Sequence, residues 1–464
     1  MTTAYTAWRL ASIFGRLQYN YDEKYIASLT LRRDGVSRFG RNKRFGYFPA
    51  AALAWRLSEE PFLKSIAVID ELKLRVSYGA TGNSDGIDNF ASLALFASPA
   101  AAAYSGQPGT NFATVLVAAG VNSPKLGNPD LSWESNVMTN FGIDYGLIKN
   151  RITGSIDYFI RDTKNLLFNV PVPSTSGFDI IIKNVGAVRN TGLELALSSR
   201  NMVGAFQWTT DFNISFNKNK VTKLLEEGKD LPNNALFLGY PLGTPFLARW
   251  AGVNPADGRA MWYDTLGNVT YNPVARDRVL MNRSVLIPKY FGGLTNTFSY
   301  KGFELSTFIQ YQVGNLVNNA GLSNQALDYR FDTNQFREVL NRWTAPGQVT
   351  DIPRLIPGAT EAGSASSLFG GNIAGSDRFY EDGSYIRLKQ LTFSYTIPSL
   401  LLSKAKLRTV RIYAQGVNLW TATRFKGFDP EFAAVTNFNT GAFGNNVGVI
   451  PPGKMYIVGL QIGF

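Results

Sequence analysis

The sequence predicts an all-β protein, an antiparallel transmembrane β-barrel segment of about 13 strands with long extracellular loops. Three observations support this fold class. Many segments alternate between apolar and polar residues, no apolar run is long enough for a membrane helix, and the connections alternate between short and long. A period of two residues is typical of a strand, and a barrel gives the two faces of each strand different surroundings, lipid outside and water inside.

The C-terminal segment, residues 454–464, shows the clearest alternation. One face would be wholly apolar with aromatic rings at both ends, whereas the other face would be small and mixed. The residues of the apolar face are Tyr456, Val458, Leu460, Ile462 and Phe464. A last strand that ends on a lipid-facing aromatic residue is typical of a transmembrane barrel, although an edge strand of a soluble sheet would show the same pattern.

The composition agrees with a barrel and excludes several other classes. The 464 residues include 32 Phe, 21 Tyr and 44 Gly, yet the mean hydropathy is only −0.07, as expected when half of each strand is polar. No run of 18 apolar residues exists, which excludes helical membrane spans. Cysteine and histidine are absent, which excludes disulfides, thiolate nucleophiles and catalytic or metal-ligating histidines.

Thirteen segments follow the strand pattern, and each reaches the roughly 9–11 residues that a tilted strand needs to cross a bilayer. Within residues 206–217, for example, Phe206 and Phe212 share one face while Gln207 and Asp211 share the other. The predicted strands are residues 8–20, 24–34, 45–57, 72–81, 133–147, 151–162, 189–200, 206–217, 288–300, 303–314, 383–397, 407–420 and 454–464.

The connections between these segments fall into two interleaved sets. One set is short: 21–23, 58–71, 148–150, 201–205, 301–302 and 398–406. The other set is mostly long: 35–44, 82–132, 163–188, 218–287, 315–382 and 421–453. Short periplasmic turns and long extracellular loops are typical of bacterial barrels, so the C-terminus is expected on the periplasmic side.

The odd number of strands carries information as well. If the chain ends in the periplasm, its first predicted strand would begin outside the cell, whereas bacterial single-chain barrels have even strand numbers. The segment after Met1 also lacks the charged start and apolar core of a signal peptide. Either one strand escapes the prediction, or the chain is the C-terminal portion of a longer barrel, which is the interpretation we favour.

Nine stretches, in this order along nearly the whole chain, resemble the C-terminal half of SusC/RagA-type TonB-dependent outer-membrane transporters of Bacteroidetes. They include YNYDEKYIASLTLRRDGVSRFG (19–40), LKLRVSYGATGN (72–83), NVGAVRNTGLELAL (184–197), DGSYIRLKQLTFSYTIP (382–398) and VRIYAQGVNLWTATRFKGFDPE (410–431). The resemblance implies a 22-stranded barrel closed by an N-terminal plug. Residues 1–464 would then be strands 10–22, without the plug, the signal peptide and the first nine strands.

The same resemblance implies a function and partners. The barrel would lie in the bacterial outer membrane and import oligosaccharides or peptides with energy from the TonB complex, which the missing N-terminal part would contact. A SusD-like surface lipoprotein would cover it as a lid. Tyr456, Leu460, Ile462 and Phe464 resemble the signal that the barrel-assembly machinery reads, and packing against lipid would explain the same residues.

Aromatic residues in the long loops are candidates for ligand binding, because flat rings suit sugar faces. Packing of the loops themselves is the alternative explanation. The candidates are Trp250, Trp262, Tyr263, Tyr271, Trp343 and Phe428. No catalytic constellation, metal site or cofactor site is predicted. Asp429 and Glu431 could suggest paired acids, but nothing in the sequence sets them across a substrate.

A basic stretch, residues 32–44, is expected at the extracellular rim. Its cations could pair with lipopolysaccharide phosphates or an anionic ligand, or form local ion pairs on a solvated hairpin. The formal net charge of the chain is +12, but no nucleic-acid-binding motif accompanies it. The segments 83–88 and 254–258 have oxygen-rich residues that turns explain more simply than calcium.

Two other functional classes stay open at this stage. The chain could form a passive outer-membrane pore or structural barrel, or it could be a soluble β-rich binding protein. The soluble class would leave the apolar faces of many strands exposed to water, which makes it the weakest of the three.

Overall fold

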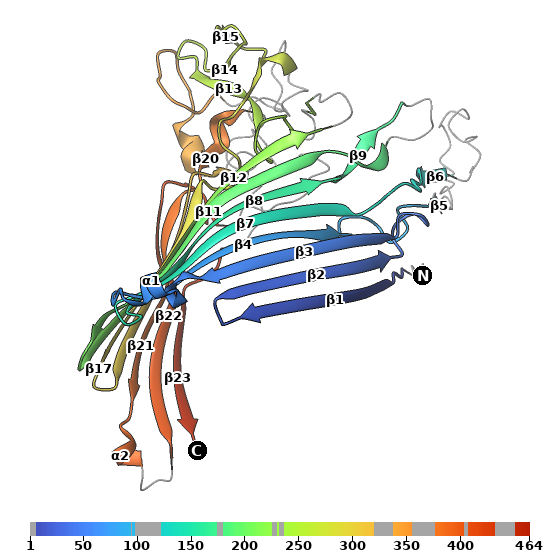
Figure 1. The fold of residues 1–464 in the computed structure, drawn as a ribbon. Helices are drawn as coiled ribbons and strands as arrows, with labels where there is room; N and C mark the ends of the chain where they lie inside the picture. The colour runs from blue at the N-terminus through green and yellow to red at the C-terminus, as the bar shows by residue number, and fades with distance from the viewer. Residues whose placement is uncertain are drawn as a thin grey trace.

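The computed structural model describes residues 6–93, 95–97, 122–173, 180–224, 230–231, 236–319, 337–354, 376–402, 407–431 and 451–464. Its main element is one curved sheet of 13 strands (Figure 1). Every neighbouring pair in this sheet is antiparallel, and the strands follow one another in chain order. The predicted fold class is therefore confirmed.

The strands of the main sheet lie where the alternating pattern predicts them. They are β1 (Leu10–Tyr21), β2 (Tyr25–Val36), β3 (Phe45–Arg56), β4 (Ile69–Asn83), β7 (Glu134–Leu147), β8 (Ile152–Lys164), β11 (Ala187–Val203), β12 (Phe206–Lys223), β17 (Tyr290–Tyr300), β18 (Phe303–Val313), β21 (Tyr385–Thr396), β22 (Thr409–Thr423) and β23 (Met455–Gly463). The outermost strands, β1 and β23, each pair with one neighbour only among the described residues.

β12 continues beyond its predicted end at residue 217 and stays paired with β11 up to Lys223. The prediction stopped early because the outward positions change from Phe216 to Lys218 and Lys220, while the backbone pairing continues. The apolar pattern therefore marks where the outer surface stops being apolar, and the strand itself ends later.

Local backbone conformation explains the short connections. Lys301 and Gly302 join β17 to β18 with φ of 48° and 86°, the left-handed conformation that two-residue hairpins of the primed turn types require. The turn between β7 and β8 also uses positive φ, at Ile148, Lys149 and Asn150. The connection from β3 to β4 folds into a short 3-10 helix, η1 (Leu57–Glu59), and one helical turn, α1 (Pro61–Lys64).

The long connections contain small elements that period-two alternation did not predict. These are β5 (Leu95–Ala97) paired with β6 (Asn122–Lys125), β9 (Leu167–Pro171) with β10 (Ile180–Asn184), β19 (Leu316–Asn318) with β20 (Tyr380–Asp382), and the four-stranded sheet of β13 (Phe246–Val253), β14 (Ala260–Tyr263), β15 (Val269–Thr270) and β16 (Arg278–Leu280). In Figure 1 they lie beyond the sheet on the side away from α2 (Ser399–Leu402), which joins β21 to β22.

One face of the main sheet forms an apolar belt. Register places Leu17 opposite Leu29 and Leu53 opposite Val76, so apolar side chains of neighbouring strands share this face. Its exposed members include Ile13, Leu17, Tyr19, Leu29, Leu53, Val76, Phe141, Ile143, Ile156, Tyr158, Phe216, Phe393, Ile412, Val458 and Leu460. An exposed apolar surface this extensive is expected to contact a membrane or another apolar partner.

Buried packing is concentrated near the long connections. Val36, Phe39, Phe48, Leu131 and Trp133 form one buried cluster, and a second cluster joins β11 and β12 to the segment that follows them. None of the helices in the described ranges is long and apolar enough to cross a membrane.

Candidate functional site: the luminal wall

The face opposite the apolar belt is polar and carries most of the charged side chains of the strands. We call this face the luminal wall. Successive side chains of a strand point to opposite faces of the sheet. Lys73 and Arg75 of β4 therefore point away from the belt that contains Leu74 and Val76. Three groups of charged residues are spread along it.

The first group joins β4, β7 and β8. Asp144 accepts two hydrogen bonds from the Arg75 guanidinium, at 2.7 and 2.8 Å, and lies 2.9 Å from Lys73 Nζ. Arg75 also reaches Asp157 at 3.0 Å. The strand register brings Arg75 and Asp157 together, because Gly142 lies opposite both of them. A Cβ on Gly142 would come within 2.7 Å of both side chains, so glycine leaves the space for this contact.

The second group is the most buried charge cluster on the wall. Arg387 of β21 donates to Asp429 at 2.7 Å, to Glu431 at 2.6 Å and to Thr421 at 2.9 Å. Arg387 is only 2% exposed and Asp429 only 6% exposed. Lys389 adds a further contact to Glu431 at 3.1 Å. These bonds hold the segment after β22 against the wall.

The third group lies on β18, β21 and β22. Arg411 contacts Glu304 at 2.9 Å and donates to Ser394 at 3.1 Å. Elsewhere on the wall, Asp211 accepts a hydrogen bond from Ser198 at 2.5 Å. Ionised groups that are paired and hydrogen-bonded in this way can line a water-filled passage without being buried alone.

The two acids that could suggest a hydrolytic pair, Asp429 and Glu431, lie on this wall. Asp429 and Glu431 both bind Arg387, so neither is set across an open space from the other. Among the residues that the structure describes, no cluster of three or more acidic side chains could hold a metal ion.

Comparison with known proteins agrees with this arrangement. The sequence profile "TonB dependent receptor-like, beta-barrel" matches residues 2–326. The chain belongs to this family of TonB-dependent receptor β-barrels. Barrels of the family reside in the bacterial outer membrane.

Curated relatives match nearly the whole chain. TonB-dependent receptor P3 of Formosa agariphila is 34% identical over 98% of this chain and 45% of its own length. TonB-dependent receptor SusC of Bacteroides thetaiotaomicron is 29% identical over 100% of this chain and 44% of its own length. The chain therefore spans about half the length of the curated relatives it matches.

The solved structure of the RagAB peptide transporter has a similar fold. It superposes with a TM-score of 0.81 at 28% sequence identity and covers 98% of this chain and 48% of that chain. The RagAB peptide importer in its open-open state superposes with a TM-score of 0.79. The matched part is the C-terminal half, so the predicted resemblance to the C-terminal half of SusC/RagA-type receptors is confirmed.

Five of the six loop aromatics predicted as ligand candidates lie in or against the four-stranded loop sheet of this TonB-dependent receptor barrel, and Phe428 lies in the segment after β22. Trp250, Trp262 and Tyr263 lie in the four-stranded loop sheet, where Trp250 and Trp262 pack edge to face with ring centroids 5.6 Å apart. Trp262 is 4% exposed, so its ring is covered. The Arg378 guanidinium lies over the Trp250 ring at 4.5 Å. The backbone N–H of Trp250 donates to Asp377, whose pKa is raised by burial.

Tyr271 and Trp343 both contact the turn that joins β13 to β14. Tyr271 accepts a hydrogen bond from Asn254 at 2.5 Å and has Arg259 over its ring at 4.3 Å. Trp343 donates to the carbonyl of Pro255 at 2.9 Å. Phe428 is 77% exposed and directly precedes Asp429, which Arg387 binds. Trp250, Tyr263, Tyr271, Trp343 and Phe428 keep accessible surface, and ligand binding by them stays a prediction.

The structure places the predicted turn residues and the basic stretch as follows. Asn83 and Asn254 each accept a hydrogen bond from the backbone N–H two residues later, as in Asx turns. In the basic stretch, Arg32 pairs with Asp34 at 2.6 Å and Arg38 with Asp85 at 3.0 Å. Local ion pairs therefore account for two of the cations of this stretch.

Three residues of the predicted assembly signal lie on the belt face of the last strand, β23, and the fourth, Phe464, follows directly after the strand. Tyr456, Leu460, Ile462 and Phe464 are all exposed, and Leu460 lies opposite Ile412 of β22. Their surface position is compatible with recognition by assembly machinery and with lipid contact.

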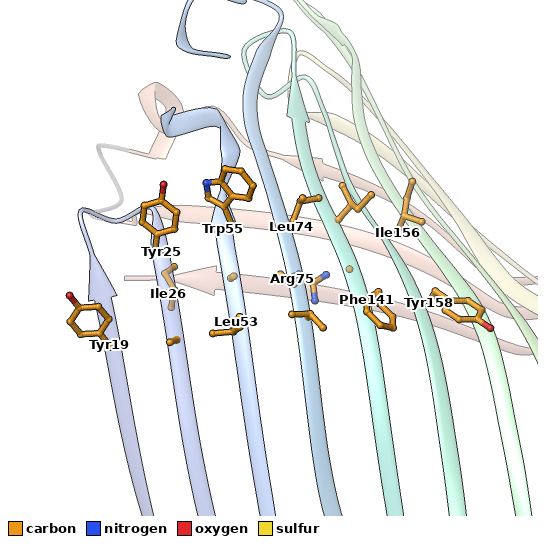
Figure 2. Close-up of a pocket in the computed structure, with 15 residues that line it drawn as sticks. Tyr19, Tyr25, Ile26, Leu53, Trp55, Leu74, Arg75, Phe141, Ile156 and Tyr158 are labelled. Atoms are coloured by element: carbon orange, nitrogen blue, oxygen red, sulfur yellow. The ribbon is translucent and has the colours of Figure 1, made fainter. Parts of the chain in front are cut away.

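The belt contains an apolar hollow of about 820 Å³ over β1 to β8. Figure 2 shows Tyr19, Tyr25, Trp55 and Tyr158 among the side chains that line it from neighbouring strands. At its edge the hydroxyl of Tyr25 and the indole N–H of Trp55 both donate to Glu60, at 2.8 and 3.1 Å. Rings with an apolar body and a polar tip are typical of the border between hydrocarbon and water.

Sequence analysis missed Arg75 and Arg387 as residues of the luminal wall. The available signal was their position on the polar face of an alternating strand, in LKLRVSYG and SYIRLKQL. Which acids they would bind depends on the strand register and on a loop that folds back, and neither can be read from alternation alone.

Proposed function

We propose that this chain forms part of the barrel of an outer-membrane active transporter that imports oligosaccharides or peptides with energy from the TonB system. The observation that carries the proposal is the sheet itself, with an apolar belt on one face and charged groups on the other. The similarity of nearly the whole chain to SusC and to the RagAB peptide transporter supports the same function.

We place the C-terminus and the short connections in the periplasm. The long connections, with the loop sheet and its aromatic residues, then face the outside. A SusD-like lipoprotein lid is the partner proposed for that side, since the similar proteins include SusC and RagAB. The plug and the TonB-contacting segment would belong to the part of such a receptor that this chain does not span.

Within this proposal, the luminal wall gives polar solutes a hydrogen-bonding surface, and the loop aromatics Trp250, Tyr263, Tyr271, Trp343 and Phe428 offer ring faces to a sugar or peptide at the entrance. Trp262 contributes packing beneath Trp250. Tyr456, Leu460, Ile462 and Phe464 serve as the signal for barrel assembly in the same proposal.

The test compares uptake by cells with and without the gene for the intact receptor, using fluorescently labelled oligosaccharides and peptides. We expect uptake of one of the two classes to disappear in the deletion strain and in a strain that lacks TonB. Uptake that requires the gene but continues without TonB would indicate the passive pore. Normal uptake of both classes in the deletion strain would contradict any transport function.

A further inference from the structure

A group of cations lies on the outward face of the sheet, at the ends of β8, β11 and β12 near the long connections. We call it the rim cation cluster, and its members are Lys164, Arg189, Lys218 and Lys220. Register brings them together across three adjacent strands. Lys220 lies opposite Arg189, Lys218 lies opposite Thr191 on the same face, and Lys164 lies opposite Ala187.

The cluster begins where the apolar belt ends. On β12 the outward positions are Phe206, Trp208 and then, further along, Phe216, directly before Lys218. A strand extends about 3.3 Å per residue and tilts by about 40° from the membrane normal. The stretch from Phe206 to Lys218 therefore spans about 30 Å along the normal, the thickness of a bilayer hydrocarbon core. The cations therefore lie at the depth of lipid headgroups.

Aromatic pairs mark both borders of the belt on these strands. Trp208 stacks on Phe298 with centroids 5.7 Å apart near the short turns, and Phe216 packs on Tyr290 at 5.7 Å next to the cluster. Two girdles of aromatic residues enclose the apolar band in outer-membrane barrels. Lys218 lies just beyond the second girdle, on the side of the long connections.

Within the described ranges, one ion pair involves this cluster. Arg189 binds Asp162 through two contacts of 2.7 and 2.9 Å. Lys164, Lys218 and Lys220 are exposed and form no ion pair with the part of the chain that the structure describes. Like charges on adjacent strands repel, so an anion bound between them would relieve a cost already present in the fold.

We propose that the rim cation cluster binds the phosphate groups of a phosphorylated glycolipid in the outer leaflet. Such a lipid places acyl chains against Phe216 and Tyr290 while its phosphates reach the ammonium groups. The proposal rests on the orientation given under the proposed function, with the long connections outside. A soluble anion would gain the charge contacts but no contact with the adjacent belt.

The test uses the intact receptor extracted in mild detergent and measures binding of a fluorescent phosphorylated lipid A in mixed micelles. The variant Lys218→Gln with Lys220→Gln is compared with Lys149→Gln with Lys301→Gln, which removes the same charge at the opposite end of the strands. Since each cation near an anionic lipid surface contributes about fivefold to binding, we expect a roughly 30-fold weaker affinity in the first variant only. Heat-modifiable gel migration checks that both variants are folded.

Three results of the lipid A binding measurement would overturn the proposal. They are an unchanged affinity in the Lys218 and Lys220 variant, an equal loss in the control variant, and equal binding of lipid A without phosphates. Displacement by millimolar inorganic phosphate would also overturn it, by indicating a free anion as the ligand. Preference for phosphatidylglycerol micelles over lipid A would place the cluster at the inner leaflet. This result would refute the orientation on which the proposal rests. The proposed transport function would still hold if the uptake experiment showed TonB-dependent uptake.

Discussion

At the scale of single residues, the luminal wall depends on a few side chains that satisfy one another. Arg387 binds Asp429, Glu431 and Thr421 at the same time, and both it and Asp429 are buried. Removing one partner of a buried ion pair leaves the other charge without compensation, which is costly even where the intact pair adds little stability.

We predict that Arg387→Gln releases residues 424–431 from the wall, because the amide cannot replace three guanidinium contacts. The change should cost about 3–5 kcal/mol of local stability, measured as faster hydrogen exchange of this segment in detergent. Lys389→Gln is the matched control. Its side chain is 30% exposed, so its loss should cost at most about 1 kcal/mol. Equal exchange in the two variants would show that Arg387 does not hold the segment.

At the scale of elements, the short connection between β3 and β4 also positions aromatic residues at the border of the belt. The connection between β3 and β4 places Glu60 against the rings of Tyr25 and Trp55. Tyr25 and Trp55 also stack, with centroids 6.2 Å apart. This arrangement fixes the aromatic border of the belt to the turn beside it.

The bonds to Glu60 predict a dependence on pH. The hydrogen bond from Tyr25, followed by that from Trp55, holds the pKa of Glu60 below its ordinary value of 4.5. A lowered pKa means that the folded state favours the carboxylate, so the stabilisation is complete above pH 4.5 and disappears as the pH falls through the lowered pKa.

The fluorescence of Trp55 in the intact receptor should therefore change in this acidic range, and Glu60→Gln should abolish that transition. Glu59→Gln, one residue away, is the control, because Glu59 contacts Arg56 and Lys64 instead. A transition that persists in the Glu60 variant would assign it to another group.

At the scale of the whole molecule, the two faces of the sheet require two solvents. Exposed apolar side chains run from β1 to β23 on one face, and ion pairs are distributed over the other. In water the belt would expose an extensive apolar surface to solvent, whereas in a bilayer it faces hydrocarbon.

Neighbouring residues of β23 test this assignment. Val458 lies on the belt and is 81% exposed, whereas Ile457 points to the other face, opposite Gln415. Val458→Arg should destabilise the membrane-inserted receptor by about 2–4 kcal/mol, because the charge would lie in hydrocarbon, and Ile457→Arg should cost much less. The yield of heat-modifiable receptor in outer membranes is the measurement. Equal yields would show that β23 does not face lipid.

The sequence by itself determined the strands and their faces. Alternation along each strand is a local property, because side chains of a strand point to opposite sides whatever its neighbours are, so Tyr456 and Leu460 could be placed on the belt in advance. The short turns followed in the same way, since two antiparallel strands joined by a few residues need only a local hairpin.

The tertiary structure alone decided which polar residues meet. The contact of Arg75 with Asp157 depends on register across β4, β7 and β8 and on the space above Gly142. The contact of Arg387 with Asp429 depends on a loop that folds back onto the wall. The rim cation cluster exists because β11 and β12 continue to pair beyond the apolar pattern. These features depend on distances between segments far apart in the chain, and alternation carries no information about such distances.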